Sequence, residues 1–251
     1  MAALLTAAGL DVTRLDADPR ALALDAAWPG SEMPRQSLPL VAGTWRGTRP
    51  GPRVLLVGHV DVVPCGDIRT WSSPPFEPVV LDGDMYGRGA CDMKGGVVAA
   101  VEAVQAIVES GIGLGGEIVV LTVPSEEDGG GGAFAAIRAG FTGDMVVIPE
   151  PTRLEVVTAH AGALTFTLDV PGKAAHASTR LEGVSALDKL QVLLHALVAD
   201  ERARNESEAN PLMRAIGLPY PTIIGKVYGG EWASTVLDRV VVEGRYGVRL
   251  G

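Results

Sequence analysis

Acidic residues and one histidine follow short apolar runs at four places in this 251-residue chain. The residues concerned are His59, Asp61, Asp92, Glu126, Glu127 and Glu150. Imidazole nitrogens and carboxylate oxygens bind divalent transition metals, and a carboxylate beside such an ion can take a proton from the water that the ion activates. We therefore interpret the set as a two-metal hydrolase site.

Each of the first two groups can be explained by a purely structural role as well as by metal binding. In His59-Val60-Asp61, alternate side chains of a strand end lie on one side, so the imidazole can bind a metal while the carboxylate supports the ring. When such a pair occurs alone, it is more often a histidine at the end of a strand with an aspartate nearby by chance. Asp92 lies among the glycines of Gly87 to Gly96, where it could also be a simple helix N-cap.

The last two groups are equally open when they are taken alone. Glu126 and Glu127 follow Pro124-Ser125, so one carboxylate can hold a metal while its neighbour acts as a general base. An acidic, solvated loop has the same composition, and Glu150 could be an exposed residue after a strand. The combination favours the metal site, because independent accidents would rarely share one sheet edge.

That shared edge follows from the predicted strands. Continuous apolar runs at 54–57, 117–123 and 145–148 are typical of strands buried on both faces of a mostly parallel sheet. A helix is predicted over 95–110, with Gly111 as its stop. This alternation indicates an α/β fold whose ligands lie at the carboxyl ends of the strands.

A second domain is predicted after residue 160. Residues 163–170 alternate between apolar and polar, 183–197 is an amphipathic helix, and 222–228 and 240–248 are strands. We therefore expect an α/β catalytic domain over 1–160 and an incomplete α+β domain over 161–251.

Composition narrows the class of partner. Lys and Arg number 21 against 30 Asp and Glu, and the net charge of -9 argues against nucleic acid and anionic membranes. No apolar stretch is long enough to span a bilayer, and the N-terminus has no secretory pattern. We expect a cytoplasmic protein with a small-molecule substrate. Neither Cys65 nor Cys91 has a nearby histidine in the sequence to activate it, so a cysteine nucleophile is not favoured.

Four ordered segments carry a family resemblance: His59 to Pro64, Gly87 to Gly96, Pro124 to Glu127, and Pro149 to Thr152. They resemble the metallopeptidase family of acetylornithine deacetylase and succinyl-diaminopimelate desuccinylase, which includes aminoacylase and glutamate carboxypeptidase relatives. The resemblance implies a zinc-peptidase-like domain with an inserted lid domain, a homodimer formed through that lid, and a role in amino-acid biosynthesis.

The resemblance also implies a role for each site residue. Asp92 would bridge two divalent metal ions, with His59 and Glu150 on one ion and Glu127 on the other. Glu126 would be the general base, and Asp61 would support His59. His176 would reach the substrate carbonyl oxygen, usually across the dimer. Zinc is the expected metal, with cobalt or manganese as alternatives, because availability also selects first-row ions.

Some family features are missing from the sequence. No histidine follows His195 to serve as a last metal ligand, so the second ion would keep only Asp92 and Glu127. The chain reads as truncated at both ends, and Ser234 and Leu237 replace the asparagine and proline of a family turn. Arg245 or Arg249 is a candidate for gripping a substrate carboxylate.

The expected function is a metal-dependent amide hydrolase, a deacylase that removes an acyl group from an N-acyl amino acid or related amine. One alternative is a carboxypeptidase or dipeptidase that acts on a peptide-like substrate. The other is a truncated, catalytically inactive metal-binding member of the family. Both alternatives remain open at this point.

Overall fold

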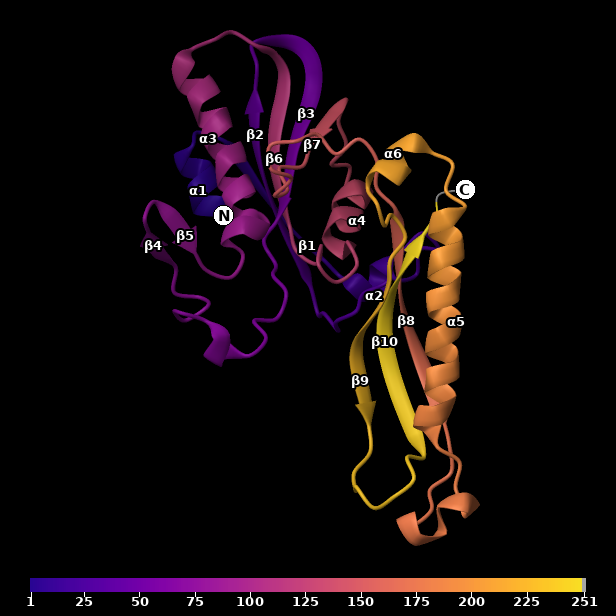
Figure 1. The fold of residues 1–251 in the computed structure, drawn as a ribbon. Coiled ribbons are helices and arrows are strands. Elements are labelled where there is room, and N and C mark those ends of the chain that lie inside the picture. Colours follow the sequence, from indigo (N-terminus) through magenta and orange to yellow (C-terminus); the bar gives the residue numbers. More distant parts are fainter. Residues whose placement is uncertain (250–251) are drawn as a thin grey trace. The chain divides into compact units, whose positions relative to one another are not determined.

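The computed structural model describes residues 1–249. These residues form two compact units, one over Met1–Glu155 and one that begins at Val156. Each unit has its own sheet and its own apolar core. Figure 1 shows the elements of both units, coloured along the sequence.

The first unit is built on a five-stranded sheet in the order β1-β2-β6-β3-β7. Its strands are β1 (Asp11–Ala17), β2 (Leu38–Arg46), β3 (Arg49–His59), β6 (Gly115–Val123) and β7 (Met145–Val147). Its helices are α1 (Ala2–Ala7), α2 (Pro19–Leu22), α3 (Gly95–Ser110) and α4 (Gly131–Arg138). A separate hairpin pairs β4 (Val79–Leu81) with β5 (Asp84–Tyr86).

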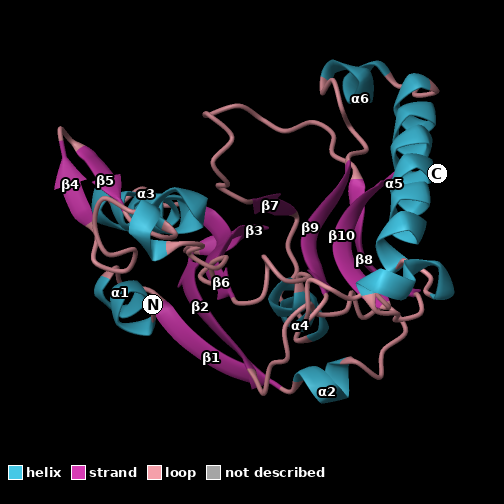
Figure 2. Ribbon diagram, turned by 60° about the horizontal axis from the view of Figure 1, so that its bottom comes forward, coloured by secondary structure: helices cyan, strands magenta, loops and turns pink. Residues whose placement is uncertain are grey.

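Helices cover both faces of this sheet (Figures 1 and 2). On one face, Val101 and Val104 of α3 pack with Leu5 of α1 and with Val120 of β6. On the other face, residues of α4 pack on the alternate side chains of the same strand. These alternate side chains are Val119, Leu121 and Val123. The continuous apolar run of β6 is thus buried on both sides, as its sequence predicts.

The α/β fold is confirmed, but the sheet is mixed. β3 runs parallel to β6 and β7, whereas β2 is antiparallel to both β1 and β6. The reason is the two-residue link 47–48, which is too short for a crossover and reverses the chain between β2 and β3. β6 then inserts between these two strands.

The predicted burial of the third apolar strand is wrong. Met145, Val146 and Val147 of β7 remain 59%, 54% and 47% exposed. β7 lies at the edge of the sheet, and β3 is its only strand neighbour within residues 1–249. An apolar run therefore indicated a strand correctly without indicating how many elements would cover it.

The second unit is a three-stranded antiparallel sheet in the order β8-β10-β9, formed by β8 (Gly162–Pro171), β9 (Thr222–Gly229) and β10 (Arg239–Val248). α5 (Ala186–Glu206) packs on one face of it, through Ala186 and Leu190 against Val240 and Val242. The short helix α6 (Pro211–Ala215) precedes β9. The predicted helix 183–197 is thus shifted: Ser185 is its N-cap, and strong helix formers extend it beyond 197.

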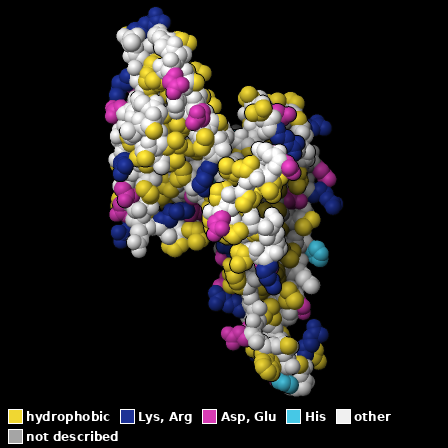
Figure 3. Space-filling view, turned by 90° about the vertical axis from the view of Figure 1, so that its left-hand side faces the viewer, with side chains coloured by type: hydrophobic (Ala, Val, Ile, Leu, Met, Phe, Trp, Pro, Cys, Tyr) yellow, Lys and Arg dark blue, Asp and Glu magenta, His cyan; other side chains and the backbone are white. Residues whose placement is uncertain are grey.

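None of the helices within residues 1–249 is both long and apolar enough to cross a lipid bilayer. On the face shown in Figure 3, dark blue Lys and Arg side chains are interspersed with magenta Asp and Glu. That face therefore offers no continuous basic surface of the kind that phosphate backbones reward.

Candidate metal centre

His59 is the centre of the candidate site. It is the last residue of β3, the strand that lies between β6 and β7, and its side chain is only 1% exposed. Its Nε2 atom lies 2.9 Å from Asp92 Oδ1, 3.9 Å from Glu150 Oε1 and 4.0 Å from Glu126 Oε2. The carboxylates of three separate segments therefore surround one imidazole nitrogen.

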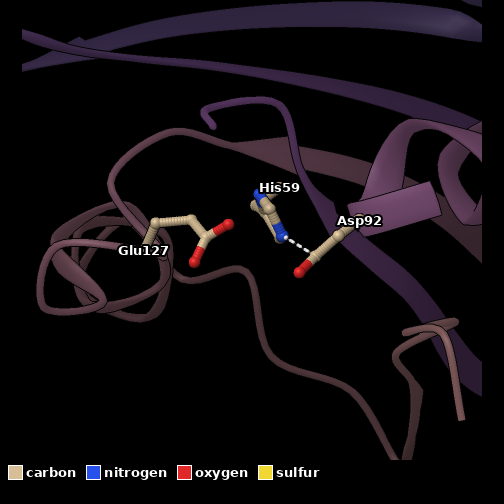
Figure 4. A group of neighbouring side chains, drawn as sticks. All are labelled: His59, Asp92 and Glu127. Atoms are coloured by element: carbon tan, nitrogen blue, oxygen red, sulfur yellow. Dashed lines mark hydrogen bonds and ion pairs between the residues drawn. The ribbon is translucent and has the colours of Figure 1, made fainter. Parts of the chain in front are cut away.

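Glu127 completes a group of three possible ligands. One ligand atom each from His59, Asp92 and Glu127 lie within 4.8 Å of one another. Figure 4 shows these side chains, with the Glu127 carboxylate directed toward the imidazole ring. An imidazole nitrogen and carboxylate oxygens at such spacings suit a divalent cation such as zinc.

Asp92 is presented by an irregular turn rather than by a helix N-terminus. It lies in the segment Ala90–Lys94 with extended backbone angles, φ -116° and ψ 100°, just before α3. The next residue, Met93, is fully buried, and its sulfur accepts a hydrogen bond from the backbone N–H of His59 at 3.2 Å. The buried methionine thus ties the turn of Asp92 to the end of β3.

Gly96 brings a third segment against this turn. A Cβ atom at Gly96 would lie 2.0 Å from the carbonyl oxygen of Pro149, the residue before Glu150. Only glycine allows this close approach of two backbones. The first turn of α3, which follows Asp92, therefore rests directly on the segment that carries Glu150.

Asp61 lies beside His59 and also contacts the loop that carries Glu126 and Glu127. The His59 Nδ1 atom lies 3.0 Å from the backbone carbonyl oxygen of Asp61 and 3.6 Å from its carboxylate. The carboxylate also accepts hydrogen bonds from the backbone N–H groups of Glu126 and Glu127, both at 3.2 Å. Asp61 thus contacts the imidazole through its carbonyl and its carboxylate, and it holds the glutamate loop through the same carboxylate. Its expected role as the support of His59 stays a prediction.

The electrostatics of the site follow from crowded negative charge. Burial raises the pKa of Glu127, and the negative charge of Asp92 raises it further against the opposing effect of His59. Burial likewise raises the pKa of Glu150, with His59 again opposing. Burial disfavours the charged form of His59, but hydrogen bonds to Asp92 and to the Asp61 carbonyl raise its pKa overall. A bound cation would relieve this repulsion.

His176 lies in the second unit, before the helical segment Ala177–Glu182. Its Nδ1 atom accepts a hydrogen bond from the backbone N–H of Ser178 at 3.2 Å. In a neutral ring this leaves the proton on Nε2, which is then free to act as a donor. Its predicted contact with substrate stays a prediction.

The structure brings together five of the predicted residues: His59, Asp92, Glu126, Glu127 and Glu150. The Asp61 carboxylate is hydrogen-bonded to the backbone of the glutamate loop. Their individual roles stay predictions. The sequence patterns did not indicate a role for Ser125 and Asp128, which flank the two glutamates in that loop, or for Arg35, which pairs with Asp128. Only the Ser-x-x-Asp spacing of the last two was visible in the sequence as a local turn signal.

Residues 55–242 match the model of Peptidase family M20/M25/M40. The chain is 37% identical to the succinyl-diaminopimelate desuccinylase of Gluconacetobacter diazotrophicus, over 60% of this chain and 42% of the relative. It is 33% identical to the acetylornithine deacetylase of Yersinia pseudotuberculosis, over 73% of this chain and 46% of the relative. The chain spans about half the length of the curated relatives it matches.

Solved structures give the same fold at lower identity. A di-peptidase from Saccharomyces cerevisiae matches with a TM-score of 0.67 and 19% identity, over 98% of this chain and 62% of that chain. A tripeptidase from Staphylococcus aureus matches with a TM-score of 0.59 and 23% identity, over 98% of this chain and 58% of that chain. These similarities establish the fold alone.

Proposed function

This chain belongs to peptidase family M20/M25/M40, and from that premise we propose that it is a deacylase that removes an acyl group from an N-acyl amino acid or related amine. The observation that carries the proposal is the convergence of three carboxylates within 4.0 Å of the buried His59 Nε2 atom. The relatives named desuccinylase and deacetylase support the choice of substrate class.

The donor set fits divalent metal ions. We propose that Asp92 is shared by two ions, with His59 and Glu150 on one and Glu127 on the other. Nitrogen and oxygen donors of this kind suit zinc, and cobalt or manganese remain alternatives. When bound, such an ion supplies Lewis-acid chemistry by lowering the pKa of water and polarising an amide carbonyl.

The remaining residues would move the proton and hold the substrate. Glu126 is the proposed general base, because its side chain is 50% exposed and reaches the site from a loop that Asp61 fixes. It would take a proton from the attacking water and return it to the leaving amine. His176, with its proton on Nε2, would donate a hydrogen bond to the carbonyl oxygen as negative charge develops there.

The second unit is the proposed lid and dimerisation domain. Exposed apolar side chains of α5 support this role, since Leu187, Val192 and Val198 are 48%, 68% and 57% exposed. A homodimer and a cytoplasmic location both stay predictions. A shift in sedimentation velocity with protein concentration would test the dimer.

A substrate panel tests the proposed activity. The zinc-loaded and cobalt-loaded chain is assayed on N-acetyl and N-succinyl amino acids and on dipeptides, and we expect hydrolysis of the N-acyl compounds. Preference for dipeptides would instead favour the peptidase alternative. If this chain is inactive while a version extended at the C-terminus is active, the catalytically silent alternative is supported for the 251-residue chain.

A further inference from the structure

Arg35 lies beside the loop that carries Glu126 and Glu127, in the segment between α2 and β2. Its Nε and Nη2 atoms both lie 2.8 Å from Oδ2 of Asp128, and Nη2 lies 4.0 Å from Oδ2 of Asp61. The Arg35 side chain is 29% exposed, while the side chains of Asp61 and Asp128 are 11% and 9% exposed. One cation therefore compensates two buried acids.

Both of these acids fix the glutamate loop, each from its own side. Asp61 accepts hydrogen bonds from the backbone N–H groups of Glu126 and Glu127. Asp128 follows them in sequence, and its second oxygen accepts a hydrogen bond from the hydroxyl of the fully buried Ser125. The loop is thus held at its start, at its middle and at its end.

The backbone of the Arg35 segment also packs on this loop. The N–H of Glu32 donates to the carbonyl oxygen of Asp128 at 2.9 Å. A Cβ atom at Gly129 would lie 2.8 Å from the carbonyl oxygen of Gly30. These backbone contacts hold the segment that carries Arg35 against the loop.

We propose that Arg35 is a positioning residue, which acts through Asp128 and Asp61 to fix the loop that presents Glu126 and Glu127. The inference rests on the proposed function, because it takes Glu126 as the base and Glu127 as a metal ligand. Arg35 itself contacts neither the imidazole nor the ligand oxygens. Its effect would therefore pass through the loop rather than through direct contact with an ion or a substrate.

Electrostatics give the physical reason. A buried carboxylate without a partner is costly, and Asp61 and Asp128 lie close to a site that is already crowded with negative charge. Without Arg35 these acids would repel each other and turn toward water, and the hydrogen bonds to the loop would be released. A lysine can pair with Asp128, but its single ammonium group lacks the planar geometry that faces both acids.

Arg35→Ala tests the proposal against Arg20→Ala as a matched control. Arg20 lines the same cavity of about 410 Å³ and gives the same loss of charge, but its partner is the exposed Asp18. Zinc binding is measured by titration calorimetry on the metal-free chain. Because groups that orient ligands typically contribute about 10- to 100-fold in affinity, we expect that loss for Arg35→Ala and no change for Arg20→Ala.

Two further variants separate positioning from general destabilisation. Arg35→Lys should restore part of the zinc affinity, and Arg35→Ala combined with Asp128→Asn should be no worse than Arg35→Ala alone, because coupled residues are not additive. In the active enzyme, kcat should fall while KM stays near the wild-type value. Should Arg35→Ala fail to fold by circular dichroism, the Arg35→Lys variant and the Asp128→Asn single variant decide the question.

The outcomes distinguish this proposal from the proposed function. Wild-type zinc affinity and kcat in folded Arg35→Ala would overturn the positioning role and leave the deacylase intact. An equal loss in Arg20→Ala, or strictly additive losses in the double variant, would also overturn it. If the wild type hydrolyses no amide but Arg35→Ala still loses zinc affinity, the positioning role stands and the deacylase fails.

Discussion

The acidic cluster of the first unit and the single carboxylate of Glu208 in the second unit differ in how their negative charge is balanced. In the candidate metal centre, burial and neighbouring carboxylates raise the pKa values of Glu127 and Glu150. In the second unit, Glu208 accepts hydrogen bonds from the Tyr220 hydroxyl and from the backbone N–H of Asn210, and these lower its pKa. The metal centre thus has more hydrogen-bond acceptors than donors, whereas the carboxylate of Glu208 is already paired with hydrogen-bond donors.

The difference separates a binding site from a structural network. A carboxylate that is satisfied by hydroxyl and N–H donors gains little from a cation, and its charge serves to hold the fold together. Carboxylates that lie close together around one imidazole repel one another. A divalent cation bound between them would stabilise their charged forms. The two groups should therefore respond in opposite ways to the same kinds of substitution.

The largest effect is expected at Asp92. Asp92→Ala should lose both proposed ions, because Asp92 is the ligand that they would share. Metal content after dialysis against zinc, measured by elemental analysis, checks this expectation. Glu208→Gln is the control, because it also removes one negative charge but lies outside the metal centre. The protein with this substitution should bind as much zinc as the wild type. Full zinc retention in Asp92→Ala would contradict the shared ligand.

Glu126→Gln should come next. General acid–base catalysis is worth about 10²- to 10⁴-fold, so kcat should fall by that factor while the amount of bound metal is unchanged. The measurement is steady-state hydrolysis of the N-acyl substrate that the panel identifies, with zinc content determined in parallel. Unchanged turnover in this variant would rule out Glu126 as the base.

Smaller effects are expected on the thermal stability of the metal-free protein, and they should have opposite signs for Glu127→Gln and Glu208→Gln. Glu127→Gln removes a carboxylate from the crowded site and should raise the thermal midpoint of the metal-free protein. Glu208→Gln weakens a satisfied hydrogen-bond network and should lower the midpoint. Differential scanning calorimetry in the presence of a chelator measures both. Shifts of the same sign would remove the distinction between the two groups.

The smallest expected effect is the pH dependence of Glu208. Its pKa is lowered in the folded state by its donors, so its contribution to stability is present above the unfolded pKa. That contribution disappears as the pH falls through the folded pKa. Urea unfolding of wild type and Glu208→Gln should therefore differ at neutral pH and converge in acid. A difference that persists in strong acid would contradict this assignment.

Much of the site was predictable from local sequence patterns. The apolar runs of β3 and β6 specify strands, and the residues after them must lie at one edge of the sheet. The family resemblance carried by His59 to Pro64 and the three later motifs is confirmed. The position of Asp92 beside His59 could be expected on the same grounds, because its segment precedes the helix that covers the strand.

Other features depend on contacts that no local pattern records. β2 was not predicted, because Pro39 and Gly43 interrupt the strand pattern, and α4 begins in a run of glycines. The exposure of β7 is set by its position at the edge of the sheet. Arg35 is 93 residues from Asp128, and nothing near it in sequence indicates the pairing.

The close approach of Gly96 to the Pro149 carbonyl has a thermodynamic consequence for the ligands on either side of it. It makes the spacing between the Asp92 turn and the Glu150 segment a property of the main chain rather than of side-chain rotamers. Less conformational entropy is then lost when an ion binds, because the backbone segments that carry Asp92 and Glu150 are already held together. The absence of a side chain at Gly96 thereby preorganises the site before an ion binds to it.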